Sequence, residues 1–335
     1  MAKTYLALFV VIMGNLALLG TASAASFDCT RAKAPREKLI CREPALSDLD
    51  EKLGRAYQER RAILSPHGAE LLERSESSWL HYLTIVCPMV VPADVAGWRN
   101  PKSCLQGMYE QRLAQLAKVG QRLGPFVFNR VDVYAAEPAS DSTGEMLGFY
   151  IHHVAYPQID NSDLPQAVAW NNRAVKSLSE CDDCGDGSDD DMEFEIGYAT
   201  GNVISMQRTT SVYPHEHAHG TFSVQADNIV LHPNPRALTE EDLFGKGDRW
   251  AQELQKLFWD ALLAKGWSPP ENVAERVKHD IEDEVILPYK WLFTTEGVQV
   301  SFSAYEGGCY ACNPGTVTVP WVGLKPLLSS SAIVP

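Results

Sequence analysis

His215, Glu216 and His219 form an H-E-x-x-H pattern, the spacing at which two histidines bind zinc and a glutamate acts as base in metalloproteases. The pattern works on a helix, because residues four apart share one face there. Here a proline precedes it and a glycine ends it, and the alternating segment 221–231 that follows predicts a strand. We therefore expect no catalytic zinc. On a strand, His215, His217 and His219 would all project from one face of a sheet.

The cysteines are the second set of residues that could do chemistry. The chain has eight, an even number, which in an oxidising compartment predicts disulfides. We expect four local pairs: Cys29–Cys41, Cys87–Cys104, Cys181–Cys184 and Cys309–Cys312. Four cysteines allow three pairings, so the first group stays open to other connectivities. The two C-x-x-C pairs could instead share one zinc ion.

The most acidic stretch of the chain, ECDDCGDGSDDDMEFE, covers residues 180–195. Its density of Asp and Gly is compatible with calcium binding, but no Glu stands at the twelfth position of a correctly spaced EF-hand loop. The alternative is a solvated loop held by a disulfide between a helix and a strand. We expect this stretch to offer a docking surface for a basic partner through Asp182, Asp183, Asp189, Asp190 and Asp191.

The first residues are typical of a secretory signal peptide. Lys3 precedes an apolar run, and Ala22-Ser23-Ala24 resembles a cleavage site. We expect residues 1–24 to be removed, leaving a periplasmic or secreted protein with no stable membrane span; an uncleaved membrane anchor is the alternative. Without Lys3, 28 basic side chains face 43 acidic ones, a net charge of −15. That charge argues against nucleic acid as a partner and favours a cationic one.

Three segments with apolar residues at helical spacing, 49–64, 71–86 and 105–119, lie in and just after the region of the first four cysteines. Ser47 followed by Asp50 resembles a capping box for the first of them. Three helices of this size bury little apolar area, so disulfides would help to stabilise them. We predict an all-α domain over residues 25–122.

The rest of the chain mixes strands and helices. Alternating patterns predict strands at 126–134, 146–156, 193–205, 206–213, 221–231, 292–302 and 316–321. Helical spacing recurs at 164–178, 248–265 and 273–285. The predicted fold class is therefore multidomain: a three-helix unit cross-linked by disulfides, then α+β structure with an antiparallel sheet. We place a small α+β domain at 126–213 and a C-terminal α+β domain at 214–328.

The N-terminal segment resembles a known family. The pattern FDC…EKLIC…LSDLDEKLGRAY…WL…C…CLQGMYEQRLAQL is similar to the N-terminal domain of LprI-type lysozyme inhibitors, over about residues 27–118. One departure is that Leu83 and Thr84 stand where the family usually has an Arg-Asp pair. The resemblance implies that lysozyme, or another basic muramidase, is the partner.

A second resemblance covers about residues 127–328. The segment FTTEGVQVSFSAYEGGCYACNPGTVTVPWVGLKPLL is similar to the end of the domain found in RsiV-type anti-sigma factors and some peptidoglycan deacetylases. Ala218-His219-Gly220 matches the Gly-Gly-Ala-His segment of that family, which implies that His219 belongs to a sheet and is not a zinc ligand. Cys309 and Cys312 stand where that family usually has no cysteine. RsiV-type proteins bind lysozyme, so both resemblances imply the same partner.

Together these patterns predict an exported, non-enzymatic lysozyme-binding protein that needs no cofactor and occludes the cleft of a muramidase. Three alternatives remain: a periplasmic immunity protein against a cell-wall-degrading toxin, a zinc hydrolase that uses His215, Glu216 and His219, and a structural or stress-sensing envelope component. Our first expectation for the contact surface, beside the acidic stretch, is the loop 90–100 with Trp98 and Arg99.

Overall fold

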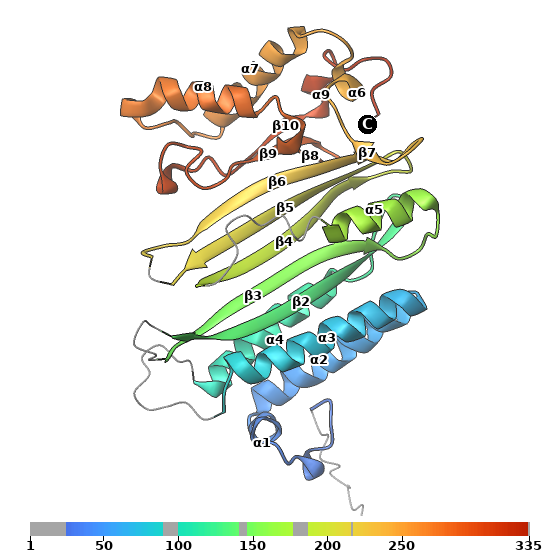
Figure 1. Cartoon of the computed structure of the whole chain (residues 1–335), viewed down its shortest axis with the longest axis vertical. Coiled ribbons are helices and arrows are strands. Elements are labelled where there is room, and N and C mark those ends of the chain that lie inside the picture. Colours follow the sequence, from blue (N-terminus) through green and yellow to red (C-terminus); the bar gives the residue numbers. More distant parts are fainter. Residues whose placement is uncertain (1–24, 90–99, 141–145, 177–186, 216, 334–335) are drawn as a thin grey trace, which may run out of the picture.

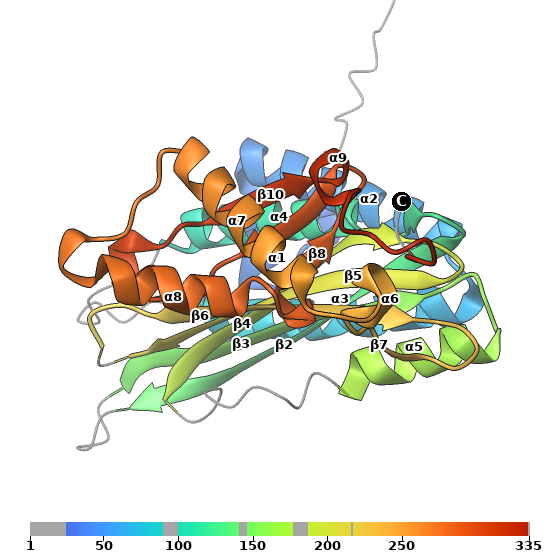
Figure 2. The same ribbon diagram turned by 90° about the horizontal axis from the view of Figure 1, so that it is seen from above.

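The computed structural model describes residues 25–89, 100–140, 146–176, 187–215 and 217–333. Along its longest dimension, the N-terminal helices lie at one end, a seven-stranded sheet in the middle, and a three-stranded sheet with its helices at the other end (Figure 1). Figure 2 shows α4 and α5 on opposite sides of the central sheet. The predicted fold class, a disulfide-linked helical unit followed by a mostly antiparallel sheet, is confirmed.

The described N-terminal unit holds four α-helices, one more than expected: α1 (Pro35–Arg42), α2 (Pro44–Ile63), α3 (Pro66–Val86) and α4 (Pro101–Ala117). Each begins with a proline, whose missing N–H and fixed φ suit the first helical position. Ser65 caps α3 by accepting a hydrogen bond from the amide of Gly68, and Asn100 caps α4 by accepting one from Lys102.

The capping box expected at Ser47 is wrong, because α2 already begins at Pro44 and Ser47 is buried inside it. Asp50 has another role. Its carboxylate accepts hydrogen bonds from the amide and hydroxyl of Ser26 and from the hydroxyl of Tyr109. It therefore ties the start of the described chain and α4 to α2.

Two of the predicted disulfides lie in this unit and are confirmed. Cys29–Cys41 joins the short 3-10 helix η1 (Cys29–Arg31) to α1, and Cys87–Cys104 joins the end of α3 to α4. The core between them is made of large apolar side chains, namely Leu46, Leu53, Leu72, Trp79, Leu83, Leu105, Tyr109 and Leu116.

The central sheet has the strand order β1-β2-β3-β4-β5-β6-β7. Its strands are β1 (Gln121–Leu123), β2 (Phe126–Ser140), β3 (Met146–Ile159), β4 (Ser188–Ala199), β5 (Val203–Pro214), β6 (Thr221–Val230) and β7 (Arg236–Ala237). Neighbours are antiparallel except β3 and β4, which are parallel and share the pairs 152/190, 153/191 and 154/192. Two antiparallel halves therefore meet at one short junction. The expected domain boundary at 213/214 falls at the last residue of β5, a strand that is hydrogen-bonded to β6, and it stays a prediction.

Helix α5 (Pro165–Lys176) covers part of the central sheet. Its Trp170 ring lies edge-on to Phe128 of β2, with the ring centroids 5.6 Å apart. Around them a hydrophobic cluster draws Ile196, Ile204 and other buried residues from β4, β5 and β6. The helix thus packs against both halves of the sheet.

The C-terminal part carries a second sheet, ordered β10-β9-β8. Its elements are α6 (Glu241–Phe244), α7 (Arg249–Ala264), η3 (Glu271–Val273), α8 (Ala274–Glu284), η4 (Pro288–Lys290), β8 (Trp291–Phe293), β9 (Gly297–Ser301), η5 (Tyr310–Cys312), β10 (Thr316–Pro320) and α9 (Trp321–Leu324). The hairpin predicted around Glu296 and Gly297 is confirmed by β8 and β9. The amide of Phe293 donates to the hydroxyl of Ser205, so the second sheet is anchored on β5.

Within the described ranges, no helix is long and apolar enough to cross a membrane.

Candidate functional site

A groove of about 350 Å³ opens between the helical unit and the central sheet. All three parts of the chain line it. The helical wall is Trp79, Tyr82, Met108 and Gln111; the sheet contributes Tyr134, Ile151, His153, Asp189, Asp190, Asp191, Ser211, Val212, Tyr213, Gly220, Thr221 and Phe222; the C-terminal part contributes Tyr310. A site built from such distant segments exists only in the folded chain.

The sheet register explains why acidic side chains reach this groove. Asp191 on β4 is paired with Ser211 on β5 and with His153 on β3, and Asp189 is paired with Tyr213. Directly paired residues project from the same face of a sheet, and alternate residues of a strand share that face. Asp189 and Asp191 therefore point the same way, towards the side that α4 partly covers. These aspartates lie in β4, so the loop expected over residues 180–195 is wrong for the part from Ser188 onward.

Asp189 and Asp190 are each held by a histidine. The Oδ1 atom of Asp189 lies 2.8 Å from Nε2 of His215 and accepts a hydrogen bond from the amide of Ile151. The Oδ2 atom of Asp190 lies 2.9 Å from Nδ1 of His152. These contacts cross from β4 to β3 and to the end of β5. They fix the two carboxylates in place.

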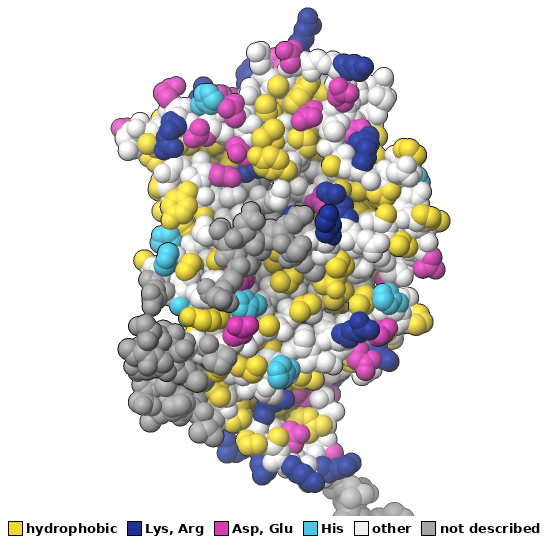
Figure 3. Space-filling view, viewed as in Figure 1, with side chains coloured by type: hydrophobic (Ala, Val, Ile, Leu, Met, Phe, Trp, Pro, Cys, Tyr) yellow, Lys and Arg dark blue, Asp and Glu magenta, His cyan; other side chains and the backbone are white. Residues whose placement is uncertain are grey.

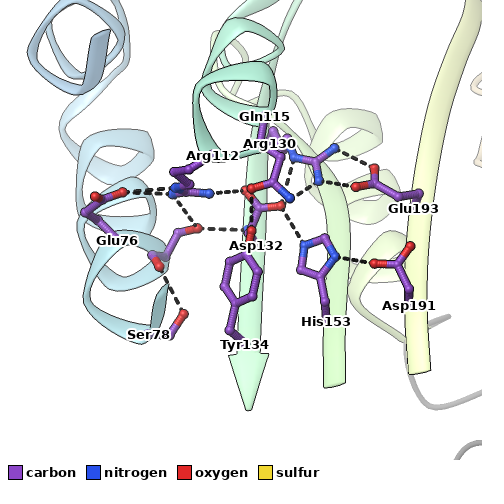
Figure 4. Close-up of polar contacts among 11 residues, drawn as sticks. Glu76, Ser78, Arg112, Gln115, Arg130, Asp132, Tyr134, His153, Asp191 and Glu193 are labelled. Atoms are coloured by element: carbon purple, nitrogen blue, oxygen red, sulfur yellow. Dashed lines mark hydrogen bonds and ion pairs between the residues drawn. The ribbon is translucent and has the colours of Figure 1, made fainter. Parts of the chain in front are cut away.

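Behind the groove lies a network of buried charges, drawn in Figure 4. Arg112 of α4 is fully buried; its guanidinium lies 2.8 Å from Asp132 of β2 and 3.1 Å from Glu76 of α3. Arg130 of β2 is also fully buried and donates two hydrogen bonds of 2.7 Å to the carboxylate of Glu193 on β4. Arg130 also contacts Asp132. The network joins α3, α4, β2 and β4 by charge-assisted hydrogen bonds.

His153 links this network to the groove. Its Nε2 atom lies 3.0 Å from Asp132 and its Nδ1 atom 2.7 Å from Asp191. Burial alone would lower the pKa of His153, but the hydrogen bonds and charges of the two aspartates raise that pKa to about 9. The ring is therefore an imidazolium at neutral pH and donates to both carboxylates. It also stacks on Tyr134 with a centroid distance of 4.4 Å.

The pKa values of two buried carboxyl groups, those of Glu76 and Asp132, are shifted in opposite directions. Burial raises the pKa of Glu76, only partly offset by Arg112. Burial would also raise the pKa of Asp132, but hydrogen bonding from His153 and the charges of Arg130 and Arg112 hold it well below its usual range. Asp132 is thus the ionised centre of the network, with a cationic group on three sides.

His153, Asp191 and Glu193 bring ligand atoms within 4.8 Å of one another, close enough for a metal ion. However, these three side chains are already engaged in hydrogen bonds and ion pairs. Both oxygens of Glu193 accept from Arg130, and Nδ1 of His153 is directed at Asp191. A guanidinium beside the three groups repels a metal cation, so the cluster is an ion-pair network and not a metal centre.

The H-E-x-x-H segment does not form a helix in its described part, and His215, His217 and His219 are not on a strand as expected. They lie in the connection between β5 and β6. His215 binds Asp189, whereas Nε2 of His219 lies 3.3 Å from the hydroxyl of Tyr305. The two histidines have separate partners and do not converge on one point. Glu216 lies outside the described residues.

The Cys309–Cys312 disulfide is confirmed, which leaves neither sulfur as a thiolate for a shared zinc site. The other predicted pair, Cys181–Cys184, lies outside the described residues, as do Trp98, Arg99, Asp182 and Asp183. Asp189, Asp190 and Asp191 are the predicted partner-binding residues that the structure describes. Their role in binding stays a prediction.

The residues that carry the N-terminal resemblance are internal. Asp50, Trp79, Tyr109 and Arg112 are all buried in the helical unit or at its contact with the sheet. Leu83, the first of the two residues that replace the Arg-Asp pair of the LprI-type family, is fully buried in the helical core. These residues hold the fold together, and of the four Trp79 also borders the groove.

Comparison with known proteins agrees with the N-terminal resemblance. The chain is 34% identical over 92 residues to the protein named Lipoprotein LprI of Mycobacterium bovis and of Mycobacterium tuberculosis. The match covers 28% of this chain and 41% of the relatives, so the chain spans less than half the length of the curated relatives it matches. The chain matches no family model.

Two solved structures of DUF3298-family proteins are similar to most of the chain. The one from Bacteroides fragilis is 15% identical, covers 64% of this chain and 97% of its own, and has a TM-score of 0.42. The one from Pseudomonas aeruginosa is 13% identical, covers 63% and 98%, and has a TM-score of 0.44. The RsiV-type resemblance stays a prediction.

Proposed function

We propose that this protein is exported and binds lysozyme or another basic muramidase, blocking the enzyme without catalysing a reaction. The observation that carries the proposal is the similarity of the chain to Lipoprotein LprI over 92 residues, together with the resemblance of residues 27–118 to LprI-type lysozyme inhibitors. The signal peptide predicted at residues 1–24 and the disulfides support an extracytoplasmic site of action.

The arrangement of charge supports a basic partner. The whole chain carries a net charge of −14, but its basic side chains are not evenly spread. Figure 3 shows several Lys and Arg gathered at the helical end of the molecule, whereas acidic and basic side chains are mixed over the C-terminal end. An acidic protein steers a cationic enzyme towards itself, and the groove with its three aspartates lies between these two ends.

Occlusion of the enzyme cleft is the simplest mechanism of inhibition, because it requires a rigid surface and no reactive residue. Lysozyme cleaves with two carboxylates in an open cleft, and a rigid body that covers the cleft stops substrate from entering. The buried charge network and the disulfides make the helical unit and the sheet one preorganised body, which lowers the entropic cost of binding. No residue of this chain needs to react.

Calorimetric titration of the signal-free protein into animal lysozymes and bacterial muramidases tests the proposal. We expect binding that weakens as salt rises, because the attraction is between opposite charges. A chito-oligosaccharide that fills the enzyme cleft should compete with binding. Binding that the sugar does not affect would contradict occlusion, and binding only to bacterial wall-degrading toxins would favour the immunity alternative.

A further inference from the structure

We infer that the groove is the docking site for a cationic side chain, arginine or lysine, presented by an exposed loop of the partner protein. The partner's identity as a muramidase rests on the proposed function, but the chemistry of the groove does not. It follows from the charge, the aromatic lining and the size of the groove, which are taken in turn.

The groove is lined by more acidic than basic side chains. Asp189 and Asp191 share the face of β4 that borders it, whereas the Asp190 carboxylate bonds His152 on the other face; the one cationic group of the described lining is His153, which is held between Asp132 and Asp191, and the lining has no lysine or arginine. Arg112 and Arg130 lie behind it, with their guanidinium groups engaged by Asp132, Glu76 and Glu193. An anionic ligand would therefore meet carboxylates without a free counter-charge, whereas a cation would meet a favourable field.

Asp191 is the carboxylate best placed to receive that cation. Its side chain is 49% exposed, more than the side chains of Asp189 and Asp190 at 30% and 8%. His153 contacts its Oδ1 atom, and among the described residues no hydrogen bond uses its Oδ2 atom. The contact with Nδ1 of His153 fixes the orientation of this carboxylate, which belongs to a residue that lines the groove.

Aromatic rings line the same groove as this carboxylate. Tyr213 and Tyr310 are large exposed aromatic side chains on the groove, 43% and 39% exposed, and Phe222 lies beside Tyr310 with ring centroids 6.5 Å apart. A guanidinium or ammonium group is attracted electrostatically to the face of each such ring. A groove lined by both carboxylates and tyrosine rings favours an organic cation over a metal ion, because a ring face attracts an organic cation and offers no ligand atom to a metal.

The rings are held in position before any ligand arrives. Tyr310 follows Cys309 and precedes Cys312, so the Cys309–Cys312 disulfide closes the short loop that carries it, and its ring lies 4.4 Å from that of His219. The Tyr213 hydroxyl donates to the carbonyl of His217. Preorganisation of this kind reduces the ordering cost of binding.

The size of the groove favours a side chain as the occupant. Its volume of about 350 Å³ is at the small end of ligand sites, which suits one inserted side chain and part of its loop. A neutral glycan chain could donate hydroxyl hydrogen bonds to the aspartates, but it would gain no attraction between opposite charges. A glycan is therefore the alternative that the experiment has to separate.

The test measures binding of hen-type lysozyme to the full signal-free chain by calorimetry. We expect Tyr213→Ala and Tyr310→Ala each to weaken binding about three- to tenfold, from the loss of one ring each. Tyr289→Ala is the matched control, because Tyr289 is 40% exposed and does not line the groove. Unchanged affinity in both groove variants, with the wild-type protein bound, would overturn the inference and leave the proposed function standing.

A second probe keeps the inference testable if the wild-type protein binds no muramidase. The peptide Gly-Gly-Arg-Gly-Gly and its neutral citrulline analogue are titrated at low salt, with chitotriose as the glycan probe. We expect the arginine peptide alone to bind, and Asp191→Asn to abolish that binding while Asp283→Asn, on α8 and outside the groove, leaves it unchanged. Equal response to both peptides, no response to either, or binding of chitotriose in the groove would overturn the inference.

Discussion

Replacement of Arg112 by alanine is the sharpest perturbation of the fold. The Arg112 side chain is fully buried, and its loss leaves the carboxylates of Asp132 and Glu76 without it. Asp132 keeps Arg130 and His153 as partners, whereas the described residues give Glu76 no other cationic partner. Removing one member of a buried ion pair costs about 3–5 kcal/mol, because the remaining charge stays desolvated. We expect Arg112→Ala to lower the free energy of unfolding by that amount.

Urea unfolding followed by tryptophan fluorescence measures the effect, since the Arg112 guanidinium lies 6.0 Å from the ring of Trp79. The matched control is Arg173→Ala, which breaks an ion pair with Asp227 in which the arginine is 48% exposed. Exposed pairs contribute about 0–1 kcal/mol. Arg112→Lys should recover only part of the loss, because an ammonium cannot bridge two carboxylates with the planar geometry of a guanidinium. Equal losses for Arg112→Ala and Arg173→Ala would refute this account of the network.

Three further perturbations have definite expected outcomes. Stability should fall as pH rises from about 6.5 through about 9, because folded His153 keeps a proton that the unfolded chain has released. Unfolding midpoints measured across that pH range test this, and a fall of the same size in the His153→Gln variant would contradict the assignment to His153. Gly68→Ala should lower stability by about 1–3 kcal/mol, because the Cβ of the new alanine would lie 2.0 Å from Oδ1 of Asp160. A melting temperature equal to that of the wild type would show that the Asp160 side chain moves aside at no cost. Replacing Cys29 and Cys41 together by serine should cost about 2–4 kcal/mol, as measured by urea unfolding, and an effect below 1 kcal/mol would mean that the cross-link does not limit the unfolded chain.

Periodicity predicted most of the elements because each buries one apolar face. The segment 71–86 lies within α3, and 146–156 and 206–213 lie within β3 and β5. Local cysteine pairing was predictable because short loops close easily, and the structure confirms three of the four pairs within its described residues. The parallel pairing of β3 with β4 was not predictable, because nothing local in either strand specifies a partner about forty residues away in the chain.

The charge network was missed for a physical reason. The segment 126–134 alternates apolar and polar residues, which normally means that the polar face meets water. Here Arg130 and Asp132 are as buried as Val131 between them, because α3 and α4 cover them and supply Arg112 and Glu76. The available signal was the sign of the charges: Arg and Asp at alternate positions of one strand can neutralise each other when buried. Asp189, Asp190 and Asp191 were predicted as part of an acidic docking stretch, a role that stays a prediction; the groove they line could not be predicted, because its aromatic wall comes from segments that only the fold brings together.

The measurement that tests the central claim most directly is the initial rate at which lysozyme clears a cell-wall suspension, with increasing amounts of the signal-free protein. The account predicts that the rate falls towards zero near one protein molecule per enzyme molecule, and that the protein alone clears nothing. An undiminished rate at large excess, for every muramidase tested, would contradict it.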